Sequence, residues 1–133
     1  MGRVLILDGM WNKSLAAVRS FGRRGFYVTA GERTRLATAI FSKYCKRRLI
    51  YSSPVTTPDD FLKDLEDELR KESYDVVFPM EFSTQVLLTD TASRPRIERY
   101  TRLPFTDANI AKKVHDKAFI MQYARERGFG IPT

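Results

Sequence analysis

Polar side chains follow three apolar runs of this sequence, at the points where buried strands would end. The runs "RVLILD", "FYVTAG" and "YDVVFPM" lead into a polar turn, a glutamate and a Glu-Phe-Ser step, respectively. The carboxyl ends of parallel strands meet at one edge of a sheet, and ligands of such folds bind beside that edge. Carboxylates and hydroxyls there could hold an amine or a hydroxyl group of a small molecule. The candidate substrate-binding residues are Asp8, Gly9, Trp11, Asn12, Ser14, Glu32, Glu81 and Ser83.

Several of these residues also have purely structural explanations. Trp11 could pack over the edge of the sheet, and Glu81 and Ser83 are residue types that favour the first turn of a helix. Gly9 permits an unusual backbone angle in the turn. A helix that begins near Ser14 could also turn its unpaired N–H groups toward an anion. Both interpretations stay open at the level of the sequence.

The turn after the first run does not have the pattern of a dinucleotide site. Such a site needs three glycines, for the tight turn, the close approach of the pyrophosphate and the packing of the helix. The turn "LDGMWNKS" offers Gly9 alone, and Trp11 and Asn12 stand where bare backbone is needed. Glu32 resembles the acid that binds a ribose, but acids are common at strand ends. The sequence also lacks a phosphate-binding loop of the G-x-x-x-x-G-K-[ST] type.

Metal and thiol chemistry find no support in the sequence. The chain has one cysteine, Cys45, and one histidine, His115, which excludes a zinc site built from these residue types. No carboxylates are spaced to chelate a metal, so we assign neither metal ligands nor catalytic residues. Cys45 is expected to be a small apolar residue in or near the core.

Apolar runs and helical patterns alternate along the whole chain. Short apolar runs predict strands, and apolar residues three and four apart predict helices. Strands are predicted at 3–8, 26–31, 47–52, 74–80 and 101–105, helices at 14–24, 58–69, 85–90, 107–113 and 115–127, and an irregular exposed connection at 92–100. Such alternation with short links requires parallel strands joined by right-handed crossovers. The predicted fold class is α/β: one domain over 1–133, with a Rossmann-like, doubly wound parallel sheet of four to five strands in three layers.

Two of the predicted helices carry specific end signals. Gly25 stands where the first helix would end in a left-handed residue. Thr57 can cap the second helix, and Pro58 suits its first position. The buried stripe of that helix is predicted to consist of Phe61, Leu62, Leu65 and Leu69.

The net charge of +7 is concentrated in one part of the chain. Between Arg19 and Arg48 the only acid is Glu32, whereas the basic residues are Arg19, Arg23, Arg24, Arg33, Arg35, Lys43, Lys46, Arg47 and Arg48. This segment could bind phosphates, face an acidic neighbouring domain or simply be solvated. Nucleic acid is not the expected partner, because no docking motif is present and the aromatics do not interleave in a surface-strand pattern.

The amino-terminal run of apolar residues is short. Val4 to Leu7 are four apolar residues, too few for the core of a signal peptide. No stretch approaches the roughly 18 apolar residues of a membrane span. A cytoplasmic protein without a membrane partner is therefore expected.

Four stretches together resemble the amino-terminal domain that precedes the catalytic part of ATP-grasp enzymes. They are "VLILDG…SLAAVRSFGRRGFYVTAGE", "SKYCKRRLIYSSP" (42–54), "YDVVFPMEFSTQVLL" (74–88) and "HDKAFIMQYARERGFGIPT" (115–133). Their order and spacing are similar to those of the carbamoyl-phosphate-synthase-like and carboxylate–amine ligase branches. The resemblance covers nearly the whole chain, although each motif is short.

The resemblance implies an ATP- and magnesium-dependent ligase that activates a carboxylate as an acylphosphate for attack by an amine. It implies that a catalytic ATP-grasp domain follows residue 133 and holds most of the ATP and the magnesium. Lys117 resembles the lysine that reaches the nucleotide phosphates, while Asp116 is expected to cap its helix. The expected partners are small carboxylate and amine substrates and that catalytic domain, and a homodimer is an open alternative. A free-standing domain that binds a small ligand or nucleotide is the alternative function, and a basic nucleic-acid-binding module is a third, less favoured one.

Overall fold

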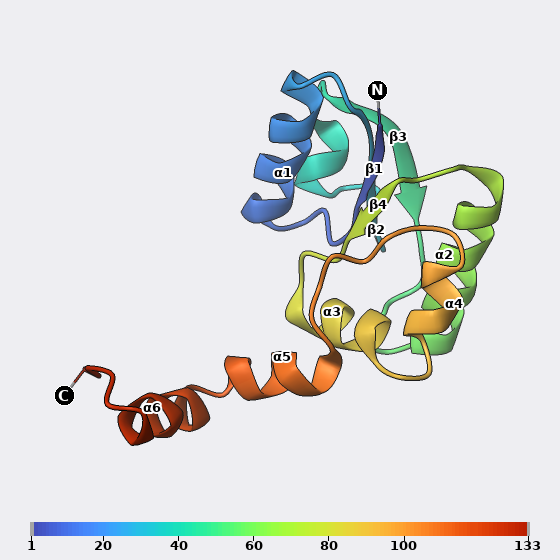
Figure 1. Ribbon diagram of the computed structural model, residues 1–133. Coiled ribbons are helices and arrows are strands. Elements are labelled where there is room, and N and C mark those ends of the chain that lie inside the picture. The colour runs from blue at the N-terminus through green and yellow to red at the C-terminus, as the bar shows by residue number, and fades with distance from the viewer. Residues whose placement is uncertain (1, 133) are drawn as a thin grey trace.

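The computed structural model describes residues 2–132 and contains one parallel sheet (Figure 1). Its strands are β1 (Arg3–Ile6), β2 (Tyr27–Glu32), β3 (Cys45–Ile50) and β4 (Val76–Phe78), in the order β3-β2-β1-β4. The three pairings between them are all parallel. The chain moves outward from β1 through β2 to β3, and then returns to the other side of β1 with β4. The predicted doubly wound α/β fold is confirmed, and its change of direction lies between β1 and β4.

Helices cover both faces of the sheet and give it three layers (Figure 1). α1 (Asn12–Arg23) and the short 3-10 helix η1 (Thr38–Phe41) lie on one face, whereas α2 (Pro58–Lys71) and α4 (Arg94–Glu98) lie on the other. The layer on the α1 side contains Val4, Ile6, Val18, Val28, Ala30 and Ile40. The layer on the α2 side contains Leu5, Leu7, Phe61, Leu65, Val77, Leu88 and Ile97. Successive residues of β1 therefore point into opposite layers, as in a sheet buried on both faces.

The end signals of the first two helices are confirmed in part. Gly25 follows α1 with a φ of 86°, which a residue without a Cβ adopts freely. Pro58 is the first residue of α2, and the four residues of the predicted apolar stripe are buried. The prediction for Thr57 is wrong in its detail, because its hydroxyl donates to the carbonyl of Ser53 and does not cap the helix.

Two predictions for residues 92–105 need correction. Residues 92–100 are not an irregular exposed connection, since they contain α4 and Ile97 is fully buried. One buried apolar residue in a five-residue helix leaves no periodic pattern in the sequence. The strand predicted at 101–105 is reduced to a single parallel bridge between Arg102 and Val76. Pro104 follows closely and has no N–H to extend the ladder.

Close packing of α1 against the segment that leads into β3 depends on Gly22. A Cβ at this position would meet the side chain of Tyr44, 2.6 Å from its Cγ. The absence of a side chain therefore lets Tyr44 lie directly against the helix. Cys45, the next residue, is half-buried against the same layer, as predicted for a small apolar residue.

The last two helices extend away from the body of the domain (Figure 1). α5 (Ala108–His115) contacts α3 (Phe82–Thr89), where the rings of His115 and Phe82 stack with centroids 3.9 Å apart. α6 (Lys117–Glu126) has no buried residue. The predicted cap of α6 is confirmed, because the Asp116 carboxylate accepts a hydrogen bond from the Phe119 N–H at 3.2 Å. No helix within residues 2–132 is long and apolar enough to cross a membrane.

Candidate functional site

A pocket of about 330 Å³ lies where the carboxyl ends of the strands meet. It is placed beside the change of direction between β1 and β4, which is where open α/β sheets bind ligands. Its walls come from the loops that follow all four strands. The lining residues are Asp8, Met10, Trp11, Glu32, Arg33, Ser53, Pro54, Val55, Glu81, Ser83 and Thr84.

Asp8 joins the two sides of this pocket. Its carboxylate accepts hydrogen bonds from the N–H groups of Met80 and Glu81, at 3.0 and 2.9 Å, and from the hydroxyl of Thr84, at 2.9 Å. Met80 and Glu81 directly precede α3 and Thr84 lies in its first turn, so the Asp8 carboxylate occupies an anion position at the start of that helix. The carbonyl of Asp8 accepts from the buried hydroxyl of Ser14 at 2.6 Å. One residue at the end of β1 thereby fixes the beginnings of two helices.

The backbone of Asp8 adopts a conformation that few residue types tolerate. Its φ is 61°, in the left-handed region, where aspartate and asparagine are more readily accommodated than other side chains. Its N–H donates to the hydroxyl oxygen of Tyr51 at 2.9 Å, and that hydroxyl also contacts the carbonyl of Gly31. Tyr51 thus locks the turn after β1 to the neighbouring strand.

The Asp8 carboxyl is electrostatically unusual. Burial raises its pKa from the ordinary value of 3.8 to about 6, because desolvation outweighs the bonds from Glu81, Thr84 and Met80. The nearby Glu32 carboxylate raises the pKa further. A carboxyl that titrates near neutrality beside a pocket is a recognised mark of functional sites.

Glu32, the last residue of β2, forms part of the wall of the pocket opposite Asp8. Its carboxylate accepts from the N–H of Met10 at 3.2 Å and from the N–H of Arg33 at 2.7 Å. The side chain is only 7% exposed, and no described residue forms an ion pair with it. Glu32 therefore holds the turn after β1 in place and leaves a negative charge in the wall of the pocket.

Apolar side chains stand at the mouth of the pocket. Met10 and Trp11 are each 51% exposed, and Val55 is 69% exposed. Trp11 is about half covered by protein, which is compatible both with packing over the edge of the sheet and with contact to a ligand. Lys13 lies 5.6 Å from the centre of the Trp11 ring, so the ring is already oriented toward a cation.

No family model matches this chain, and no curated protein matches it significantly.

The structure brings five of the eight candidate substrate residues into one pocket: Asp8, Trp11, Glu32, Glu81 and Ser83. The other three lie outside its lining. Gly9 donates its N–H to the carbonyl of Gly31, Ser14 is buried below Asp8, and Asn12 is the exposed first residue of α1. Lys117 is also separate, since it is an exposed residue at the start of α6.

The sequence did not indicate several residues that line or support this pocket. Tyr51 and the residues Ser53, Pro54 and Val55 follow β3, and Thr84 lies in the first turn of α3. The rule that placed the other candidates also applies to the end of β3, and would have pointed to 51–55. The contact between Tyr51 and Asp8 spans 43 residues, so it has no signal in the local sequence.

The pocket is poorly suited to magnesium or to a nucleotide phosphate. Within the described part of the chain, no three histidine, cysteine or acidic side chains are placed to hold a metal ion. The Asp8 carboxylate accepts from the N–H groups of Met80 and Glu81, directly before α3, so a negative charge already lies at the start of that helix and disfavours a phosphate there. The other charged groups lining the walls include two further carboxylates, Glu32 and Glu81. Three carboxylates against one arginine, Arg33, disfavour a ligand with a net negative charge.

Proposed function

We propose that this chain is the substrate-side domain of an ATP-dependent ligase that joins a carboxylate to an amine through an acylphosphate. The observation that carries the proposal is the convergence of Asp8, Glu32 and Glu81 on one pocket at the carboxyl ends of the strands. The similarity of the chain to pre-ATP-grasp domains supplies the reaction class. The pocket supplies a reason to assign the amine-bearing substrate to this chain.

The charges of the pocket favour a small molecule with an ammonium group. Three carboxylates line the walls, and the exposed Trp11 ring at the mouth can contact a cation. The carboxylate of Glu81 accepts no hydrogen bond from the described residues, so it is free to accept one from a ligand. Arg33 also lines the pocket and could bind a carboxylate at the other end of the ligand. A zwitterion such as an amino acid fits this distribution of charge.

The proposal assigns ATP and magnesium to a separate catalytic unit. Lys117, the candidate phosphate ligand, lies on α6, outside the pocket, and its side chain is exposed. The same helix exposes Phe119 and Tyr123, whose rings are 5.9 Å apart. An exposed lysine beside exposed aromatic rings suits a helix that a second unit covers. The chemistry that ATP and magnesium supply, activation of a carboxylate, would take place in that unit.

Replacing Lys117 in the full-length ligase is expected to weaken ADP release. Amino acids and small carboxylates, offered as pools with ATP and magnesium, should stimulate ADP release by the unaltered protein. Lys117→Ala should lower this rate by about tenfold or more, because one charge-assisted contact to phosphate is lost. Lys113→Ala on α5 removes a similar exposed charge and is the matched control. Equal rates in the two variants would remove Lys117 from the phosphate site.

The isolated chain is expected to bind a zwitterionic ligand but to bind ATP only weakly. Calorimetric titration with amino acids should give a dissociation constant that rises about tenfold in Glu81→Gln, since a charge-assisted hydrogen bond is lost. Glu126→Gln on α6, far from the lining, should leave binding unchanged. Ligand binding by the chain without ADP release by any full-length protein would favour the free-standing ligand-binding domain, which the self-contained pocket also supports. Tight ATP binding by the chain alone would contradict the proposed division of roles.

A further inference from the structure

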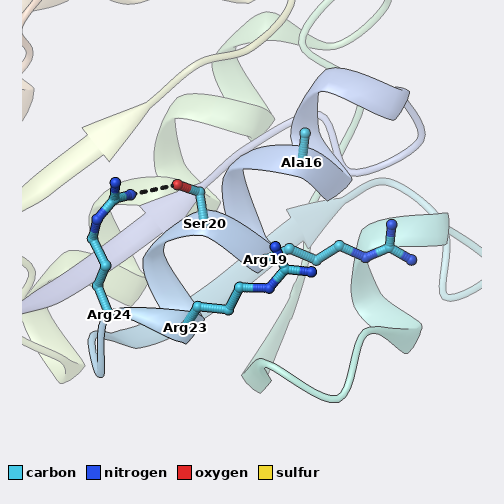
Figure 2. Close-up of a pocket in the computed structure, with 5 residues that line it drawn as sticks. All are labelled: Ala16, Arg19, Ser20, Arg23 and Arg24. Carbon is cyan, nitrogen blue, oxygen red and sulfur yellow. Dashed lines mark hydrogen bonds between the residues drawn. The ribbon is translucent and has the colours of Figure 1, made fainter.

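A second surface of the molecule carries positive charge and has no part in the pocket. On the outer side of α1, a shallow groove of about 510 Å³ is lined by Ala16, Arg19, Ser20, Arg23 and Arg24 (Figure 2). The side chains of Arg19 and Arg23 run along the same side of the helix, whereas Arg24 turns to the other side. There its Nη1 donates to the hydroxyl of Ser20 at 2.7 Å.

The basic side chains of two other segments continue this surface. Tyr44 packs directly on α1 at Gly22, and the Lys43 ammonium lies 5.2 Å from the centre of the Tyr44 ring. Arg48 of β3 pairs in register with Ala30, whose side chain belongs to the α1 layer, so Arg48 lies on the same side of the sheet. We call these five residues the basic face: Arg19, Arg23, Arg24, Lys43 and Arg48.

The charge of the basic face is not compensated within the domain. All five side chains are exposed, and within residues 2–132 none of them takes part in an ion pair. The only acid between residues 9 and 58 is Glu32, which is buried in the wall of the pocket. Elsewhere on the domain, Arg3, Arg70, Arg94 and Arg96 pair with acids, whereas Lys63, Lys71 and Arg99 are exposed and take part in no ion pair within residues 2–132. The basic face differs in that its charges lie in a stretch of chain with a single, buried acid, which fits a surface whose counter-charge comes from a partner.

An exposed aromatic ring lies within this surface. Phe41, at the end of η1, is 61% exposed, and the guanidinium of Arg48 lies 5.8 Å from its ring centre. The two residues are seven positions apart and on different elements, so their contact is seen only in the structure. Arginines that bind phosphates beside a ring that stacks on bases are the combination found in proteins that bind single-stranded nucleic acid. An acidic polypeptide would use the charges but has no bases to stack on the ring.

We propose that the basic face and Phe41 bind single-stranded nucleic acid without sequence preference. Arg19 and Arg23 are one helical turn apart, about 6 Å along the axis. A flexible strand can bring neighbouring phosphates to both guanidinium groups. The strand then continues past Lys43 to Arg48, where a base stacks on Phe41. This surface lies on the outside of α1 and β3, so its function is independent of the ligand in the pocket.

Fluorescence anisotropy with a labelled single-stranded oligouridylate of about 20 nucleotides tests this proposal. The unaltered chain should bind with an affinity that falls steeply as salt rises. Arg19→Gln/Arg23→Gln should weaken binding by about tenfold at moderate salt and reduce the slope of log affinity against log salt by about 1.4. Phe41→Ala should weaken binding at least about fivefold without changing that slope, because a stacking contact carries no charge. Lys63→Gln/Lys71→Gln, on α2 across the sheet, removes the same charge and should bind as the unaltered chain does.

Three results would overturn the proposal. The first is the absence of oligonucleotide binding at low salt. The second is an equal loss of affinity in the α1 and α2 variants, which would show that only net charge matters. The third is competition by polyglutamate as strong as that by unlabelled oligouridylate, together with an unaltered affinity in Phe41→Ala. That third outcome would assign the basic face to an acidic protein partner.

Discussion

Replacing Asp8 with alanine is expected to lower the free energy of unfolding by about 3 kcal/mol at neutral pH. The change leaves the N–H groups of Met80 and Glu81 and the hydroxyl of Thr84 without their acceptor. Each buried unsatisfied group costs about 1–3 kcal/mol, and the pocket lets water replace part of that loss. Alanine at a φ of 61° adds roughly 1 kcal/mol of backbone strain. Urea denaturation followed by circular dichroism measures the sum.

Two further variants at this position separate the contributions. Asp8→Gly removes the side chain without the backbone strain, and should lie between the unaltered chain and Asp8→Ala. Asp8→Asn keeps a carbonyl oxygen for the two N–H groups and a side chain that tolerates positive φ. It should be far more stable than the alanine variant. A stability of Asp8→Asn equal to that of Asp8→Ala would show that Asp8 does not organise the start of α3.

Comparison with Asp8→Asn also shows how the titration of Asp8 makes the free energy of unfolding depend on pH. The folded-state pKa of Asp8, about 6, lies above its ordinary value of 3.8, so the folded chain holds this proton more tightly than the unfolded chain does. The stability that this contributes is complete below about pH 4 and is lost as pH rises through 6. Relative to Asp8→Asn, the unaltered chain should therefore lose about 2.5 kcal/mol between pH 4 and 7.5. A parallel pair of stability curves would contradict the assignment.

Replacing Glu68 with alanine is expected to cost about 2–3 kcal/mol. This carboxylate is only 5% exposed and receives two bonds from Arg47, at 2.8 and 3.0 Å. It also accepts from the Tyr74 hydroxyl at 2.7 Å. Loss of one partner of a buried pair costs about 3–5 kcal/mol, and we expect less because the Arg47 side chain is 35% exposed and can reach water. The pair joins α2 to the edge strand β3, so thermal unfolding should show the loss directly.

The pH dependence of this variant should have the opposite sign to that of Asp8. Burial raises the pKa of Glu68, but the bonds from Arg47 and Tyr74 lower it by more, and the net pKa lies below the ordinary value of 4.5. The stabilisation is present above the unfolded-state pKa and is lost as pH falls through the folded-state pKa. The difference between the unaltered chain and Glu68→Gln should therefore shrink in acid. Glu98→Gln changes a carboxylate that is 43% exposed and pairs with Arg94, and it should cost less than about 1 kcal/mol.

The fold was predictable because its main signals are local. The apolar run that becomes β1 and the stripe of α2 each follow from residues close together in sequence. The failures involve elements too short to have a period. α4 buries Ile97 through the packing of its neighbours, and the fifth strand is prevented by Pro104 after a single bridge. Neither outcome can be derived from the segment alone.

The candidate site was predictable to the extent that it follows the geometry of strand ends. Asp8, Glu32 and Glu81 come from three separate loops, and the rule for parallel sheets correctly placed them at one edge. The rule does not predict which of these carboxylates bind other parts of the protein and which can bind a ligand. The carboxylate of Asp8 accepts hydrogen bonds from residues at the start of α3. The carboxylate of Glu81 accepts none from the described residues and can bind a ligand. That difference depends on distances of 2.9–3.0 Å between residues more than 70 positions apart.

Because α6 is exposed, we expect it to unfold locally without unfolding of the sheet. Its ten residues have no buried side chain, and an isolated helix of that length is only marginally stable in water. The amide protons of α6 should therefore exchange with solvent by local fraying, orders of magnitude faster than those of β1, which open only when the sheet unfolds. A unit that covers Phe119 and Tyr123 would abolish this fraying. Slower deuterium exchange of the α6 amides would therefore report directly that a second unit has bound to this helix.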